Sequence, residues 1–176
     1  AIESYRQAIG IDPDHADAHG NLGLAYKKSG NHKKAIESYK QAIRINPEDA
    51  GAHNNLGYAY DELGKYEEAI KSYKQVIRID PDDEQAHFYL GLAYGESGKY
   101  EEAIESFKQA IRLDPDYTLA HSGLGAAYSK SGKYQEAIEP FKQAIRIKPD
   151  YADAHYFLGL AYFTLGMDKE AIEPFK

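Results

Sequence analysis

The chain has 176 residues, of which 43% are hydrophobic and 28% are charged, a balance that is typical of a soluble helical protein. Its formal net charge of −7 argues against a nucleic-acid-binding protein, which normally presents a basic face. The chain has no cysteine, so disulfides and thiolate metal sites are excluded and a cytoplasmic location is favoured. No apolar run approaches the ~18–20 residues of a membrane span, so we predict no membrane insertion.

All seven prolines recur with a spacing of 34 residues. One series consists of Pro13, Pro47, Pro81, Pro115 and Pro149, and a second consists of Pro140 and Pro174. A fixed period in this range indicates a solenoid, in which one small unit stacks on copies of itself. The period therefore predicts a single solenoid over residues 1–176.

The units follow one another without a linker. We predict the second helix of a truncated unit at 1–15, a truncated last unit at 152–176, and complete units at 16–49, 50–83, 84–117 and 118–151. Each complete unit contains two segments with helical periodicity. In the second of these, Ala69, Tyr73 and Val76 recur at i, i+4 and i+7 and form one apolar stripe. The expected total is eleven helices, one alone and then five pairs.

Several positions carry the same residue in five successive units. Counting from the start of each unit, Leu stands at position seven, Gly at eight and fifteen, Tyr at eleven, Ala at twenty and Tyr or Phe at twenty-four. A glycine such as Gly64 ends the first helix, and a proline such as Pro81 ends the second. The pattern L-G-x-x-Y…G…A-x-x-x-[YF]…P resembles the tetratricopeptide repeat (TPR) along the whole chain. The resemblance implies an all-α fold, a right-handed TPR superhelix (α-solenoid) of antiparallel helix pairs.

Position four departs from the family pattern. It usually carries a large residue, often Trp, and here it holds His19, His53, His87, His121 and His155. A metal array is one interpretation, but stacked helices lie ~8–10 Å apart and zinc needs ligands within ~2.1 Å. We therefore interpret these histidines as half-buried rings that replace the usual aromatic residue. With no recognisable catalytic motif either, we predict no enzyme activity, no catalytic residue, no cofactor and no metal.

The resemblance also implies where a partner binds. In TPR proteins the first helices line a concave groove that binds peptides or partner helices, through positions two, five, six, nine, twelve and thirteen. The candidate partner-binding residues are Leu24, Lys27, Lys28, Asn54, Asn55, Tyr58, Asp61, Glu62, Phe88, Tyr89, Leu92, Glu96, Ser122, Ala126, Lys130, Tyr156, Phe157, Leu160 and Phe163. In an alternative interpretation, some of these rings pack between neighbouring first helices.

One TPR class, which binds the C-termini of heat-shock chaperones through a carboxylate clamp, does not fit. That clamp needs Lys at position five, which here holds Gly20, Asn54, Phe88, Ser122 and Tyr156. Only its Asn at position six is matched, by Asn21 and Asn55. We therefore expect a protein or peptide partner of another kind.

The sequence predicts a non-enzymatic protein-interaction scaffold. Two alternatives stay open, a recruiting arm of a larger enzyme and a self-assembling structural scaffold. Because neither end shows a polar cap, we expect either a fragment of a longer protein or self-association through the ends. Pro140 and Pro174 fall inside second helices, where we expect a bent or locally widened helix.

Overall fold

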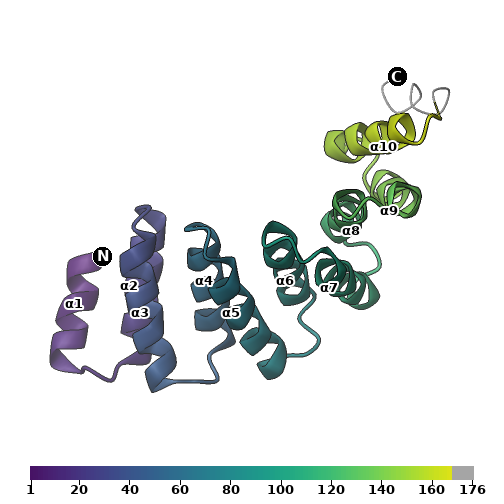
Figure 1. Ribbon diagram of the computed structural model, residues 1–176. Coiled ribbons are helices and arrows are strands. Elements are labelled where there is room, and N and C mark those ends of the chain that lie inside the picture. Colours follow the sequence, from purple (N-terminus) through teal and green to yellow (C-terminus); the bar gives the residue numbers. More distant parts are fainter. Residues whose placement is uncertain (168–176) are drawn as a thin grey trace. The chain divides into compact units, whose positions relative to one another are not determined.

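The computed structural model describes residues 1–167, and in this range the chain forms ten α-helices and no strand (Figure 1). The helices are α1 (Ile2–Ile11), α2 (Ala16–Lys28), α3 (His32–Ile45), α4 (Ala50–Asp61), α5 (Tyr66–Ile79), α6 (Glu84–Glu96), α7 (Tyr100–Leu113), α8 (Thr118–Lys130), α9 (Tyr134–Ile147) and α10 (Ala152–Thr164). The first helices are α2, α4, α6, α8 and α10. The all-α fold of helix pairs is confirmed, and the expected eleventh helix and Pro174 lie outside the described residues.

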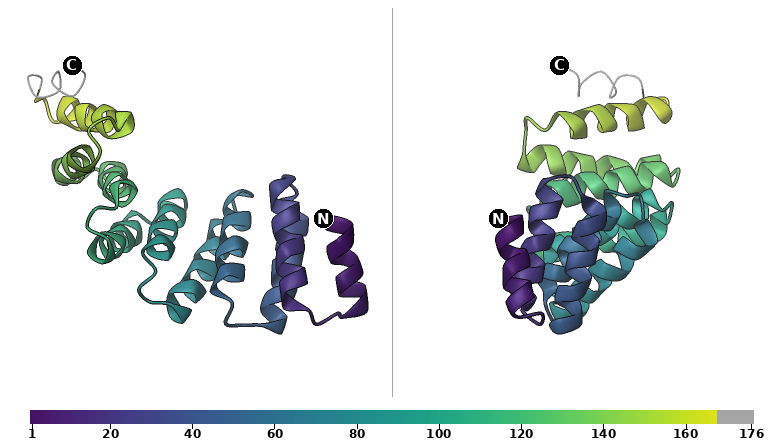
Figure 2. Two further views of the ribbon diagram at one scale, coloured as in Figure 1. Left: turned by 180° about the vertical axis from the view of Figure 1, so that it is seen from behind. Right: turned by 90° about the vertical axis from the view of Figure 1, so that its left-hand side faces the viewer.

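The helices form two compact units, residues 1–82 with α1 to α5 and residues 83–176, of which α6 to α10 are described. In each unit every helix packs against the next one along the chain, as the side-by-side ribbons of α2 to α5 show (Figures 1 and 2). This is the nearest-neighbour packing of a repeat protein. The extent of a single solenoid domain over 1–176 stays a prediction.

The turn inside each helix pair depends on one glycine. Gly64 has a φ of 68°, in the left-handed region, and Gly30, Gly98, Gly132 and Gly166 have φ values between 70° and 80°. At this turn the Lys65 N–H donates to the Tyr60 carbonyl at 2.9 Å, which closes the end of α4. A side chain would strain this backbone, so glycine at position fifteen sets the length of the first helix.

A second glycine brings the two helices of a pair together. A Cβ atom on Gly57 of α4 would lie 2.7 Å from the ring of Tyr73 in α5. Gly23 and Tyr39 have the same relation in α2 and α3, with a distance of 2.6 Å. Glycine at position eight therefore makes room for the ring at position twenty-four, and this ring is almost completely buried in both pairs.

Histidines at position four join the first helices α2, α4, α8 and α10 to the turn before them. The His53 Nε2–H donates to the Pro47 carbonyl at 2.9 Å, and the same bond links His19, His121 and His155 to the proline six residues earlier. His53 and His121 are buried, and His19, His87 and His155 are half-buried. Because a carbonyl only accepts, the proton must be on Nε2 in each of these rings.

Pro140 lies in the interior of α9, which is α-helical from Tyr134 to Ile147 without a π-helical turn. The expected local widening is therefore not found, and a bend at this position stays a prediction. In the other units the equivalent serines donate to the carbonyl four residues earlier, for example Ser106 Oγ to the Glu102 carbonyl at 2.8 Å. Pro140 has neither a hydroxyl nor an N–H, so it offers the Glu136 carbonyl no donor.

Within each compact unit, cations at position twenty-five connect a second helix to the first helix that follows it. The Lys40 ammonium lies 5.7 Å from the ring centroid of Tyr60, and the Lys142 ammonium lies 5.7 Å from that of Tyr162. In α1 the Arg6 guanidinium donates to the Tyr26 hydroxyl at 2.8 Å. These contacts recur with the repeat, because position eleven is always tyrosine and position twenty-five is always Lys or Arg.

Candidate functional site: the first-helix face

Exposed apolar side chains gather on the first helices. Of the nine large hydrophobic residues that are exposed in the described part of the chain, seven lie at predicted groove positions of the first helices: Tyr58, Leu92, Leu119, Tyr156, Phe157, Leu160 and Phe163. The second helices α3, α5, α7 and α9 expose none of the nine. We call the surface formed by positions two, five, six, nine, twelve and thirteen of the first helices the first-helix face.

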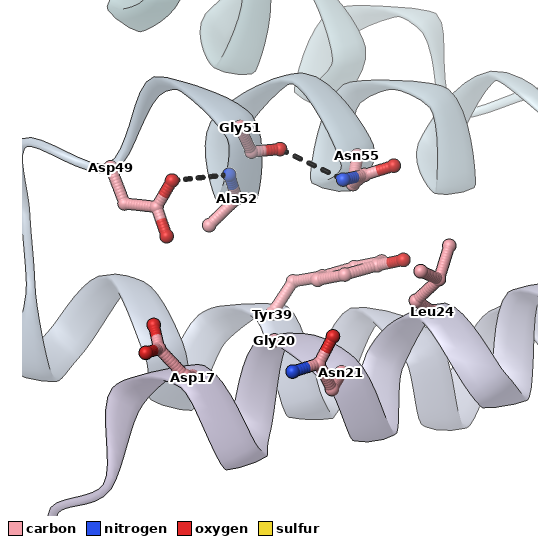
Figure 3. A pocket seen from close by; sticks show the side chains of 9 residues that line it. All are labelled: Asp17, Gly20, Asn21, Leu24, Tyr39, Asp49, Gly51, Ala52 and Asn55. Atoms are coloured by element: carbon pink, nitrogen blue, oxygen red, sulfur yellow. Dashed lines mark hydrogen bonds between the residues drawn. The ribbon is translucent and has the colours of Figure 1, made fainter.

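In residues 1–82 this face contains a pocket between α2 and α4 (Figure 3). Its volume is about 280 Å³. It is lined by Asp17, Gly20, Asn21, Leu24, Tyr39, Asp49, Gly51, Ala52 and Asn55. Gly20 at position five of one unit and Gly51 at position two of the next have no side chain, which leaves space for the pocket between the two helices.

The floor of the pocket is the ring of Tyr39, which comes from the second helix α3 and lies between α2 and α4 (Figure 3). The side chain is 1% exposed, and its hydroxyl has no hydrogen-bond partner. Burial raises the pKa of Tyr39 to about 12. At the same position, the Tyr73 hydroxyl donates to Asp61 Oδ2 at 2.7 Å, and the later units carry Phe107 and Phe141.

Some polar side chains in the walls of the pocket form hydrogen bonds within the protein, and others do not. The Asn55 amide donates to the Gly51 carbonyl at 3.0 Å and accepts from the Lys27 ammonium at 2.7 Å. Asp49 caps α4 by accepting from the Ala52 N–H at 2.9 Å. In contrast, the exposed side chains of Asp17 and Asn21 make no hydrogen bond or ion pair with the rest of residues 1–167.

Lys27 reaches from α2 to α4 beside this pocket. Its ammonium also lies 4.8 Å from the ring centroid of Tyr58, so it contacts both an amide oxygen and an aromatic face. Burial, and then the neighbouring charge of Lys28, lower the pKa of Lys27. The structure therefore brings together four of the predicted residues of this unit: Leu24, Lys27, Asn55 and Tyr58.

The other predicted residues of this unit do not line the pocket. Asp61 accepts from the Tyr73 hydroxyl of α5, and Glu62 lies 4.0 Å from the imidazole of His32. Lys28 is exposed and Asn54 is half-buried. Both carboxylates are thus partly engaged by second helices.

In residues 83–176 two predicted residues are not available on the surface. Phe88 is 8% exposed, and its ring lies 5.9 Å from that of Phe107 and 5.1 Å from that of Tyr117, between centroids. Ser122 is also buried. The expectation that Phe88 and Ser122 face a partner is therefore wrong. The Phe88 ring belongs to the core instead, and its contacts are with the second helix α7 and with the residue that precedes α8.

The surface of this second unit is formed by other residues. Tyr156, Leu160 and Phe163 of α10 are exposed, with Phe163 the most open at 69%. Phe157 is 37% exposed and stacks on Phe141, with 5.9 Å between centroids and 17° between planes. Leu92 and Leu119, both at groove positions, add exposed apolar area on α6 and α8.

Between α6 and α8 the face is polar. The Lys130 ammonium lies 3.2 Å from Glu96 Oε1, so these two predicted residues form an ion pair with each other. Tyr89 and Ala126 are half-buried on the same helices. The first-helix face of this unit therefore combines one ion pair with the exposed apolar side chains of α6, α8 and α10, whereas the pocket of the first unit is mainly polar.

Sequence reasoning missed the pocket residue Tyr39. Leu119 stands at position two, one of the six groove positions of the family pattern, so the sequence already indicated it. Tyr39 comes from a second helix, so the first-helix pattern could not include it. The sequence does show that Tyr39 carries a hydroxyl where Phe107 and Phe141 have none, and this difference between units could have drawn attention to it.

Within residues 1–167 no group of three or more His, Cys, Asp or Glu side chains could hold a metal ion. No helix in this range is long and apolar enough to cross a membrane.

Known structures share this fold. A crystal structure of MamA is 30% identical in sequence, covers 88% of this chain and 90% of that chain, and has a TM-score of 0.84. A crystal structure of YrrB, described as a TPR protein with an unusual peptide-binding site, is 22% identical, covers 99% and 90%, and has a TM-score of 0.81. PilF of Pseudomonas aeruginosa is 23% identical, covers 94% and 75%, and has a TM-score of 0.77.

Sequence comparison gives the family. None of the curated proteins matches the chain significantly. The family model of the cilia and flagella-associated protein 70 C-terminal domain, a TPR domain, matches residues 1–176. The chain therefore belongs to this tetratricopeptide-repeat family.

Proposed function

We propose that this chain is a non-enzymatic protein-interaction scaffold that binds a peptide or a partner helix on its first-helix face. One observation carries the proposal: seven of the nine exposed large hydrophobic side chains lie on that face. A surface that only contacts water has no physical reason to expose rings such as Tyr156 and Phe163 on one class of helix. Exposed apolar patches commonly mark interaction sites.

The chemistry of the face suits a polypeptide. Large rings and leucines supply anchoring energy in protein interfaces, and charged residues around them set orientation and association rate. Tyr156, Leu160 and Phe163 are spaced as anchors on one side of α10, and Leu92 provides a further apolar contact on α6. YrrB, which shares the fold, is described as having a peptide-binding site, so the fold has a precedent for this role.

The full set of candidate contacts follows from this proposal. They are the predicted residues without Phe88 and Ser122, together with Leu119, Asp17, Asn21 and Tyr39. A cytoplasmic location and a partner other than a chaperone C-terminus stay predictions from the sequence.

The test is a comparison of two double variants in a pull-down with mass spectrometry from a lysate of the source organism. Tyr156→Ala with Leu160→Ala removes two exposed side chains of the first-helix face. Lys71→Ala with Glu105→Ala is the matched control, because both residues are exposed on second helices. Melting curves of both variants establish that the helical fold is retained.

We expect a specific partner that the control retains and the face variant loses. The affinity for this partner should fall by ~1–4 kcal/mol for each hot-spot ring that is removed. A partner that binds the face variant normally and fails to bind the Lys71→Ala, Glu105→Ala control would contradict the proposal.

A further inference from the structure

We propose that the pocket between α2 and α4 binds a basic side chain, arginine or lysine, of the partner polypeptide. The inference rests on the proposed function and adds the class of residue that the partner presents there. Two independent features of the pocket support it, two carboxylates that form no ion pair and a buried hydroxyl without a hydrogen-bond partner.

The carboxylates of Asp17 and Asp49 lie at one end of the pocket and face each other across the gap between α2 and α4 (Figure 3). Neither forms an ion pair with a cation of residues 1–167. Like charges that face each other repel, and a bound cation relieves this repulsion. No lysine or arginine lines the pocket, and Lys27 beside it is already engaged with Asn55 and Tyr58.

The second feature is Tyr39. Its side chain is 1% exposed. Its hydroxyl is the one polar group of the pocket that is buried without a hydrogen bond. A buried hydroxyl without a partner is unfavourable, and the later units avoid it with Phe107 and Phe141. Tyr39 also lines the pocket, and its hydroxyl lies toward Leu24 and Asn55, at the opposite end from Asp17 and Asp49 (Figure 3). A polar group of the ligand that reaches this end can supply the missing hydrogen bond.

The available groups favour an organic cation over other ligands. Asp17 and the free amide of Asn21 offer acceptor oxygens on one wall, and Asp49 offers its second oxygen on the other. A calcium ion needs six to eight oxygen ligands, and residues 1–167 contain no cluster that could hold a metal. A guanidinium carries five N–H donors and an ammonium three, while the aliphatic stem of either side chain can pack on the Tyr39 ring.

The size of the pocket agrees with one side chain. At about 280 Å³ it lies at the lower limit of the ~300–1,000 Å³ that is usual for small-molecule sites. The net charge of −7 also favours association with a basic segment.

The experiment uses the full chain and small probes, followed by NMR of the backbone amides. The probes are N-acetyl-arginine amide, N-acetyl-lysine amide, the neutral isostere N-acetyl-citrulline amide, and N-acetyl-leucine amide. The variants are Asp17→Asn, which removes one charge of the pocket, and Asp153→Asn. Asp153 is the matched control, because it stands at the same position two in the first turn of α10, outside the pocket.

We expect the two basic probes to shift the amide signals of Gly20, Gly51 and Ala52 in wild type and in Asp153→Asn. Asp17→Asn and the citrulline probe should each weaken binding by roughly tenfold, since a charged hydrogen bond is lost. Tyr39→Phe should weaken it by a smaller factor while the fold is retained.

The inference is overturned if the leucine probe binds this pocket as tightly as the arginine probe, or if Asp17→Asn and Asp153→Asn bind the basic probes equally. Basic probes that shift no signal near the pocket also overturn it. These results leave the proposed function intact, because that is tested separately by the Tyr156→Ala, Leu160→Ala pull-down.

Discussion

At the scale of single residues, the aromatic rings at position twenty-four differ in whether they carry a hydroxyl and in what that hydroxyl contacts. Tyr39 and Tyr73 are both 1% exposed, but only the Tyr73 hydroxyl donates to a carboxylate, that of Asp61. Phe107 and Phe141 fill the same place without a hydroxyl. Stability alone therefore favours phenylalanine at residue 39, and the presence of tyrosine there is consistent with a binding role.

The pair Tyr39→Phe and Tyr73→Phe tests this difference. We expect Tyr39→Phe to raise the free energy of unfolding by about 1 kcal/mol, because it removes a buried hydroxyl without a partner. Tyr73→Phe should lower it by ~1–3 kcal/mol, because it removes a hydrogen bond to a charged group. Urea denaturation measures both. Equal effects of the two substitutions would show that the hydroxyls have the same environment.

The raised pKa of Tyr39, about 12, also predicts a dependence of stability on alkaline pH. The unfolded tyrosine ionises near pH ~10, so the unfolded state loses its proton first as the pH rises. The stabilisation is complete below pH ~10 and is lost as the pH approaches ~12. The pKa of Tyr117 is raised to about 12 as well, chiefly by burial.

We therefore expect the melting temperature to fall between pH ~10 and ~12, and to fall less in the Tyr39→Phe, Tyr117→Phe variant. Melting followed by circular dichroism across this range is the measurement. A double variant with the same alkaline slope as wild type would show that other groups govern the transition.

At the scale of elements, α9 contains an interior proline where α3, α5 and α7 have a serine. Pro140→Ser restores an N–H donor and a hydroxyl of the kind that Ser106 uses on the Glu102 carbonyl. We expect the free energy of unfolding to rise by up to ~3 kcal/mol. The reciprocal change, Ser106→Pro in α7, should lower it by a similar amount. A Pro140→Ser variant that is less stable than wild type would show that packing of the proline ring outweighs the lost hydrogen bond.

The histidine at position four belongs to the same scale, because it joins a helix to the preceding turn. His53→Phe keeps a flat ring but removes the donor to the Pro47 carbonyl. We expect the free energy of unfolding to fall by about 1 kcal/mol. An increase in stability would mean that His53 only replaces the aromatic residue that is usual in the family.

At the scale of the whole molecule, the sequence predicted the helix pairs but not the orientation of each side chain. Residues such as Gly64 and Pro81 allow few backbone conformations, so their spacing predicted where the helices end. Whether Phe88 points to the surface depends on its tertiary contacts with Phe107 and Tyr117, which the repeat pattern does not determine. Tyr39 could not be placed in the pocket because its contact with α4 is tertiary.

The central claim is that the first-helix face binds the partner, and site-specific photo-crosslinking tests it most directly. A photo-reactive p-benzoylphenylalanine is placed at Leu160 on this face in one variant and at Lys71 on a second helix in another. After irradiation in a lysate of the source organism, we predict a discrete covalent adduct with one partner at residue 160 and none at residue 71. Adducts that form at residue 71 and are absent at residue 160 would contradict the account.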